Sequence, residues 1–104
     1  MLRIYSFIVE SLKVLGPVLK EIARHDVDLA RQARRAASSI ALNTAEAYGC
    51  VGGNERLRFR TALGSAQEVK ACLDVAVALA YVEEDVVLRD RFDRIAATLY
   101  RLAT

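Results

Sequence analysis

The feature that most constrains this chain is a run of small residues from Arg31 to Gly49, RQARRAASSIALNTAEAYG. Alanine has the highest helix propensity, so the run is strongly helical on local grounds. Its small and apolar residues mark two faces of the expected helix, one with Ala33, Ala37, Ile40 and Thr44, the other with Ala41, Ala45 and Tyr48. Such a helix is usually covered on more than one side. The run therefore predicts either a central helix of a bundle or a contact between subunits.

Apolar residues recur at three- and four-residue steps in four segments, which predicts four helices. The first runs from about residue 2 to 24, the second from the Asp26 connection to about 48, the third from 54 to about 81, and the fourth follows a connection at 82–83. Short connections favour antiparallel neighbours. The sequence thus predicts an all-α protein, an antiparallel up-down-up-down four-helix bundle, as a single domain over residues 1–104.

Turn and cap residues mark the expected ends of these helices. Gly16-Pro17 lies inside the first apolar stripe, which predicts a kink within one long helix. Asp26 and Asn54 are expected to cap the second and third helices, because short polar side chains accept hydrogen bonds from the first free backbone amides. The glycines at 49 and 52–53 are expected to end the second helix.

Two polar sets interrupt the small and apolar faces of the second and third helices. We predict that they face each other between these helices as a structural polar core, formed by Ser39, Asn43, Glu46, Ser65 and Glu68. Buried carboxylates would need partners there. The alternative is that both glutamates are solvated surface charges. Glycine in the middle of a helix lowers helix stability by about 1 kcal/mol relative to alanine. Its presence at position 64 therefore predicts that another helix approaches closely there.

Arginines concentrate in the middle of the chain although the net charge is only +2. From residue 29 to 60 there are six arginines and two acidic residues, the arginines being Arg31, Arg34, Arg35, Arg56, Arg58 and Arg60. Each trio starts a helix, so an antiparallel pair would place the trios at opposite ends as two patches, which oligomerisation could merge into rings. Arginine binds phosphate bidentately, so these residues are candidates for contacts with an RNA or DNA backbone. A solvated helix face is the alternative.

The sequence offers little for catalysis or cofactor binding. His25 is the one histidine, so neither a catalytic triad nor a di-iron Glu-x-x-His pair can be built. Glu46 and Glu68 could share a cation, but no further ligands accompany them. Cys50 and Cys72 lack zinc spacing and are expected to be free thiols. We therefore expect no enzyme activity, no metal and no cofactor.

The apolar N-terminal segment is broken by Glu10 and Lys13 and is not followed by a small-residue cleavage site. No uninterrupted apolar stretch reaches the roughly 18 residues that suggest a membrane span. The expected location is the cytoplasm, without a membrane partner.

Three motifs resemble one protein family across nearly the whole chain. They are residues 32–40 (QARRAASSI), 43–47 (NTAEA) and 62–68 (ALGSAQE). They look like the four-helix-bundle proteins encoded in intervening sequences of bacterial 23S ribosomal RNA genes, a family that includes accessory variability determinants of diversity-generating retroelements. The family centre usually reads Asn-Ile-Ala-Glu-Gly, and this chain has Thr44 and Ala47 at the second and fifth places.

The resemblance implies a homopentameric ring of antiparallel four-helix protomers. In the retroelement members a strongly basic pentamer binds nucleic acid and a reverse transcriptase. Our first hypothesis is a non-enzymatic homo-oligomeric module that binds RNA or a nucleoprotein partner, such as a reverse transcriptase, through the six arginines. The alternative is a protein-interaction scaffold without nucleic-acid binding.

Overall fold

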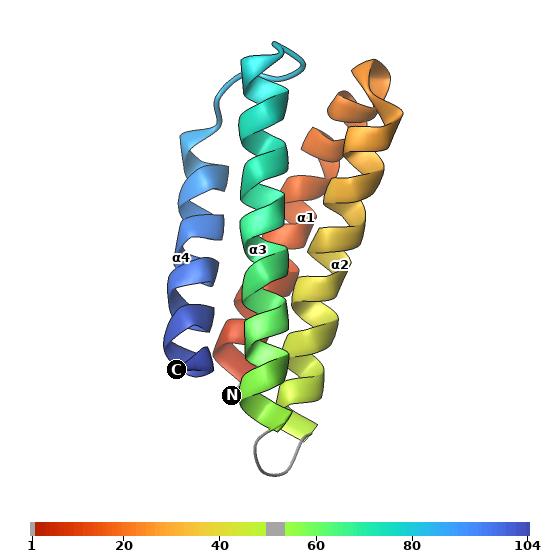
Figure 1. The fold of residues 1–104 in the computed structure, drawn as a ribbon. Coiled ribbons are helices and arrows are strands. Elements are labelled where there is room, and N and C mark those ends of the chain that lie inside the picture. Colours follow the sequence, from red (N-terminus) through yellow and green to blue (C-terminus); the bar gives the residue numbers. More distant parts are fainter. Residues whose placement is uncertain (1, 50–53) are drawn as a thin grey trace.

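The computed structural model describes residues 2–49 and 54–104, so Cys50 and the expected stop at Gly52–Gly53 lie outside the described residues. The helices in these ranges are α1 (Leu2–His25), α2 (Val27–Gly49), α3 (Asn54–Ala78) and α4 (Val86–Ala103). They run alternately up and down, and both termini lie at the same end (Figure 1). Each helix packs on its sequence neighbours, and α1 also contacts α4. The predicted all-α antiparallel bundle is confirmed.

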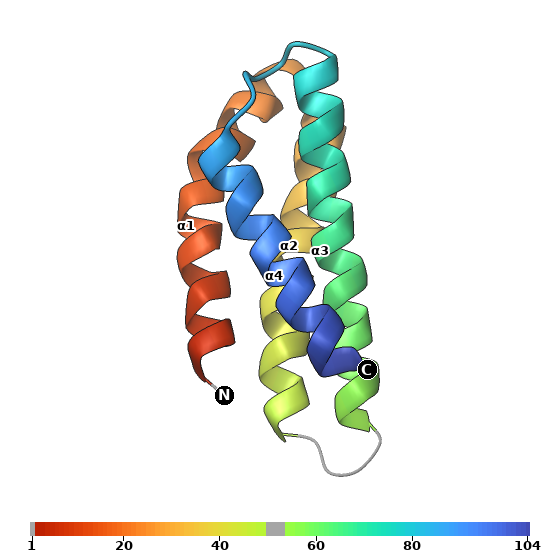
Figure 2. The same cartoon turned by 90° about the vertical axis from the view of Figure 1, so that its left-hand side faces the viewer.

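Helix α1 is one continuous helix that contains Pro17. Its buried residues Ile8, Leu15, Leu19 and Ile22 come from both sides of the proline. The same apolar face therefore continues through Pro17, which is itself exposed. Figure 2 shows the helix axis changing direction partway along its length, as the Gly16-Pro17 pair predicts.

The core is filled by large residues of α1, α3 and α4 and by alanines of α2. Phe59, Phe92 and Ile95 are among the largest side chains that are fully buried. Helix α2 instead buries six alanines, namely Ala30, Ala33, Ala36, Ala37, Ala41 and Ala47. Short side chains allow close approach, and α2 makes its most extensive contact with α3. Helix α2 is not enclosed on all sides, however, because Ser38, Leu42 and Ala45 are exposed in the protomer.

Aspartates cap two of the helices. The Asp26 carboxylate accepts a hydrogen bond from the Leu29 backbone N–H at 3.0 Å, which confirms the predicted cap of α2. Asp85 accepts from the Leu88 N–H at 3.0 Å at the start of α4. Helix α3 already includes Asn54 as its first residue, and the residue before it, at the place that Asp26 and Asp85 hold in α2 and α4, lies outside the described residues.

Helix α3 ends at Ala78, three residues before the expected end at Tyr81. The reason is Ala80, whose φ of 62° is left-handed and cannot continue a right-handed helix. The Ala80 N–H donates to the Val77 carbonyl at 3.0 Å and the Tyr81 N–H donates to the Ala76 carbonyl at 2.9 Å, which is a Schellman ending. The Tyr81 ring then stacks on His25 with centroids 5.3 Å apart, so the turn is tied to the end of α1.

Thr44 is fully buried on α2, and its hydroxyl has no hydrogen-bond partner among the described residues. A hydroxyl that is buried without a hydrogen-bond partner loses its bonds to water, and no protein bond replaces them. This loss destabilises the folded state. Thr44 occupies the place where the resembled motif has isoleucine, so the polar atom stands at a core position.

No helix in the described ranges combines the length and apolar character that a membrane crossing requires.

Replacing Ala80 by glycine should stabilise the protein by about 1 kcal/mol, because glycine adopts positive φ without the Cβ clash that alanine meets. The matched control is Ala97→Gly at an exposed interior position of α4, which should cost about 1 kcal/mol. Urea unfolding followed by circular dichroism measures both. A destabilising Ala80→Gly would contradict the left-handed ending of α3.

Thr44→Val keeps the side-chain shape and removes the unpartnered hydroxyl, so it should stabilise the fold by about 1 kcal/mol. Thr61→Val is the control, since Thr61 is exposed and its hydroxyl donates to the Leu57 carbonyl at 3.0 Å. That change should stay within about 0.5 kcal/mol. Thermal melts of both variants test this, and a loss of stability in Thr44→Val would show that the hydroxyl is satisfied.

Candidate nucleic-acid interface

The six predicted arginines are exposed and lie towards opposite ends of the α2–α3 pair. Arg31, Arg34 and Arg35 are near the start of α2, and the other trio is near the start of α3. Because the two helices are antiparallel, these starts are far apart along the bundle (Figure 1). The structure therefore separates the two trios within one protomer, as the antiparallel arrangement predicts.

The α2 trio borders an open hollow of about 410 Å³ that is also lined by Ser38, Ser39, Leu42 and Asn43. Arg31 pairs with Asp28 at 3.3 Å, and both side chains are exposed. Arg34 and Arg35 form no ion pair with any described residue. Two unpaired guanidinium groups therefore flank a surface hollow that also offers hydroxyl and amide groups.

Arg35 and Ser39 also line a second hollow of about 450 Å³ over the seam between α2 and α3. Its other lining residues include Ser65 and Glu68 of α3. Glu68 brings a negative charge to this hollow, which is unfavourable for a phosphate. The first hollow is therefore the better candidate for an anion.

The α3 trio does not form one patch. Residues two apart on a helix point in nearly opposite directions, so Arg58 lies on a different side from Arg56 and Arg60. Arg58 faces α2, where it pairs with Glu46 at 2.9 Å and donates to the Asn43 side-chain oxygen at 3.4 Å. This corrects the expectation of a second arginine patch. Phe59 is buried, with its ring edge-on to Tyr48, so it offers no surface for stacking a base.

The two polar sets do meet between α2 and α3. The Ser65 hydroxyl donates to the Ser39 hydroxyl at 2.7 Å, and the Asn43 amide donates to the same hydroxyl at 3.0 Å. Arg58 extends this network to Glu46. The contact is at the surface seam, however, because the buried face of α2 is occupied by residues such as Ala37 and Ile40.

Neither glutamate belongs to a polar core in the protomer. The Glu46 side chain is 58% exposed although it is paired with Arg58, and Glu68 is exposed as well. The expectation of buried carboxylates is therefore wrong for the single chain, and the alternative of surface charges holds. Only Ser39, Asn43 and Ser65 of the predicted set are partly buried.

Gly64 is exposed, and a Cβ built on it would meet nothing within 4 Å. The expected close approach of another helix is thus absent from the described part of the protomer.

Gly64 belongs to an exposed row of small and apolar residues spaced seven apart on α3, formed by Leu57, Gly64, Ala71 and Ala78. We call this row the α3 stripe. Leu57 is 55% exposed, and Leu42 on α2 is 65% exposed.

Arginines on the polar face of α4 tie this helix to α1 and α3. Arg91 donates through Nε to the buried Ser11 hydroxyl of α1 at 2.8 Å. Arg89 pairs with Asp74 of α3 at 2.6 Å and with Glu84 at 2.9 Å. The sequence signal for the Arg91 contact was Ser11, which interrupts the apolar stripe of α1. A hydroxyl buried in that stripe needs a hydrogen-bond partner, and so predicts a polar side chain opposite it.

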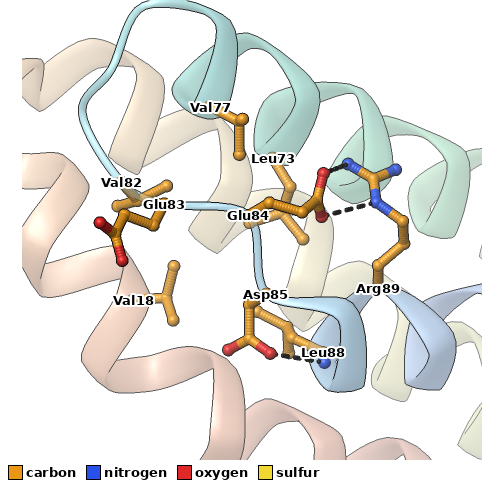
Figure 3. Close-up of a pocket in the computed structure, with 9 residues that line it drawn as sticks. All are labelled: Val18, Leu73, Val77, Val82, Glu83, Glu84, Asp85, Leu88 and Arg89. Atoms are coloured by element: carbon orange, nitrogen blue, oxygen red, sulfur yellow. Dashed lines mark hydrogen bonds and ion pairs between the residues drawn. The ribbon is translucent and has the colours of Figure 1, made fainter.

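A small cavity lies under the loop between α3 and α4 (Figure 3). Val18, Leu73 and Val77 are among its apolar lining residues. Glu84 on the loop is paired with Arg89, and Asp85 caps α4. The volume of about 20 Å³ is enough for a single water and too small for an organic ligand.

Cys72 is a free and buried thiol. Burial raises its pKa, and the charge of Glu68 raises it further. The thiol therefore stays protonated at neutral pH, where a nucleophile or metal ligand would need the thiolate.

A sequence profile of the 23S rRNA-intervening sequence protein family matches residues 8–101, which reach from α1 to α4. This profile supports the resemblance to the proteins of 23S rRNA intervening sequences. It does not show a relation to the accessory proteins of retroelements. Neither a curated protein sequence nor a solved structure matches the chain significantly. Because the profile covers nearly the whole chain and all four helices, the chain belongs to the 23S rRNA-intervening sequence protein family.

Proposed function

We propose that this protein is a non-enzymatic, homo-oligomeric helical module that binds RNA through the outer face of α2. The observation that carries the proposal is the pair Arg34 and Arg35, which is exposed and without ion pairs among the described residues beside a hollow of about 410 Å³. The family name supports an RNA-related role.

The chemistry of this hollow suits a phosphate backbone. Guanidinium groups bind phosphate oxygens bidentately, and the neighbouring Ser38 and Asn43 side chains can donate further hydrogen bonds. No aromatic ring lines the hollow, so bases would not be stacked there. Binding at this site is therefore directed to the backbone, and it should depend strongly on salt.

The α3 stripe supports self-assembly. A repeat of seven residues is the spacing at which one helix presents a continuous seam to another. Glycine and alanine in such a seam let a second helix approach closely. A helix of another copy would then pack on Gly64, which no helix of the same chain does. The same row fits a second copy of this chain. The pentameric ring and the reverse-transcriptase partner that the resemblance implies remain expectations.

The exposed leucines favour one other function, a protein-interaction scaffold without affinity for nucleic acid. Leu42 and Leu57 would then contact a different protein rather than a second copy. The two functions differ in their response to salt, because apolar contacts do not weaken as phosphate contacts do when salt rises.

The RNA proposal predicts a specific loss in the double variant Arg34→Ala/Arg35→Ala. Gel shifts with structured RNA across a salt series should show weaker binding and a log–log salt slope less steep by about 1.5, because two phosphate contacts are removed. Lys20→Ala/Arg24→Ala removes two exposed charges of α1 at the same end of the bundle and should leave the slope unchanged. Absent or salt-independent binding by the unaltered protein would overturn the proposal.

The assembly proposal predicts that Gly64→Gln separates the copies. Light scattering of the unaltered protein should give a multiple of 11.5 kDa, and the variant should shift toward 11.5 kDa. The variant chain itself should fold, because Gly64 is exposed and glutamine favours helix. Ala97→Gln, an exposed small residue of α4, is the control and should keep the larger mass. A mass of 11.5 kDa for the unaltered protein would contradict self-assembly.

A further inference from the structure

An aromatic ring of α1 lies against two arginines of α4, on the face of the bundle away from the α2 hollow. The Cζ atoms of Arg91 and Arg94 lie 4.6 and 4.7 Å from the centroid of the Phe7 ring. In Figure 2 α4 is in front and α2 is behind it. This arrangement brings together residues more than eighty positions apart in the sequence.

The two arginines have different surroundings. The Arg91 side chain is 22% exposed, its Nε donates to the Ser11 hydroxyl at 2.8 Å, and its guanidinium forms an ion pair with Glu10 at 3.8 Å. Arg94 is exposed and forms no ion pair with a described residue. A guanidinium group that stacks on a ring uses its face and keeps its in-plane N–H groups free. Phe7 therefore holds Arg94 in place while its donors remain available.

Arg94 borders an open hollow of about 280 Å³ between α1 and α4. The other lining residues are Arg3, Ile4, Phe7 and Thr98. Arg3 is exposed and, like Arg94, has no ion pair among the described residues. Thr98 also accepts a hydrogen bond from Arg101 at 3.4 Å, which adds a third arginine nearby. No acidic residue lines the hollow, so its charge is positive.

From this geometry we infer a second RNA contact, in which the hollow between α1 and α4 binds a phosphate group of a single-stranded backbone. Arg3 and Arg94 supply the charged donors from two helices, Thr98 supplies a hydroxyl, and Ile4 with Phe7 forms an apolar wall against the sugar. The volume is below the roughly 300–1,000 Å³ of pockets that enclose small molecules, so it suits one unit of a passing chain.

The inference rests on the proposed function for the identity of the polymer, and it adds a site on a different face. The hollow is held ready for binding because Arg94 is packed on Phe7 and Arg91 is fixed by Ser11. A positioned donor loses less side-chain entropy when it binds than a free one does.

The test measures the affinity of the full chain for a fluorescein-labelled oligouridylate of twenty nucleotides by fluorescence anisotropy. Arg3→Gln/Arg94→Gln should weaken binding about 20-fold at 0.1 M salt and make the salt slope less steep by about 1.4, from the loss of about 0.7 per phosphate contact. Arg3→Gln alone leaves the packing on Phe7 intact and should cost about fivefold. Lys20→Gln/Arg24→Gln is the matched control and should change the affinity less than twofold.

The outcomes separate this inference from the α2 site. An unchanged affinity in Arg3→Gln/Arg94→Gln, together with a loss in Arg34→Ala/Arg35→Ala, overturns the inference and leaves the α2 proposal in place. A loss of affinity in Arg3→Gln/Arg94→Gln with an unchanged affinity in Arg34→Ala/Arg35→Ala supports binding in the hollow between α1 and α4 and contradicts binding at the α2 site. No binding of the unaltered protein to the oligouridylate overturns the inference, and no binding to structured RNA overturns the α2 proposal. Equal losses in the arginine variants and in the control show unspecific charge attraction and also overturn the inference.

Discussion

The close packing of α2 on α3 is the contact on which the rest of the structure depends. Alanines on the buried side of α2 bring the two helices together, and the large side chains of the core come mainly from the other three helices. Close packing leaves no room at the seam for long polar side chains, so short ones occupy it. Ser39 and Ser65 hydrogen-bond there at 2.7 Å, and the longer Arg58 and Glu46 pair outside them.

This packing also explains where the charges are. Since one side of α2 is fully used by alanines, its arginines project from the other side and line a surface hollow. Helix α4 differs, because its Arg89 and Arg91 reach across to α3 and α1 and are partly buried. Arginines thus have two roles, as exposed donors on α2 and as connections between helices on α4. Arg94 has both, since it packs on Phe7 and keeps its donors exposed.

The local sequence predicted the helices well and the surroundings of single side chains less well. Periodicity and caps located all four helices, and Asp26 caps α2 as expected. The end of α3 was placed three residues late, because nothing in the sequence signals that Ala80 adopts a positive φ. Glu46 and Gly64 were expected to be covered, yet both are exposed in the protomer, since small residues on a face do not reveal whether the same chain covers it.

The sequence by itself determined the four helices, their antiparallel order and the family, because helix periodicity, short connections and the family motifs are all local properties. The tertiary structure alone decided which arginines are free and which are paired. It paired Arg58 of α3 with Glu46 of α2, and it brought Phe7 and Arg3 of α1 to Arg94 of α4. The physical reason is that pairing and exposure depend on which helix lies opposite, and that neighbour is set by the packing of distant segments.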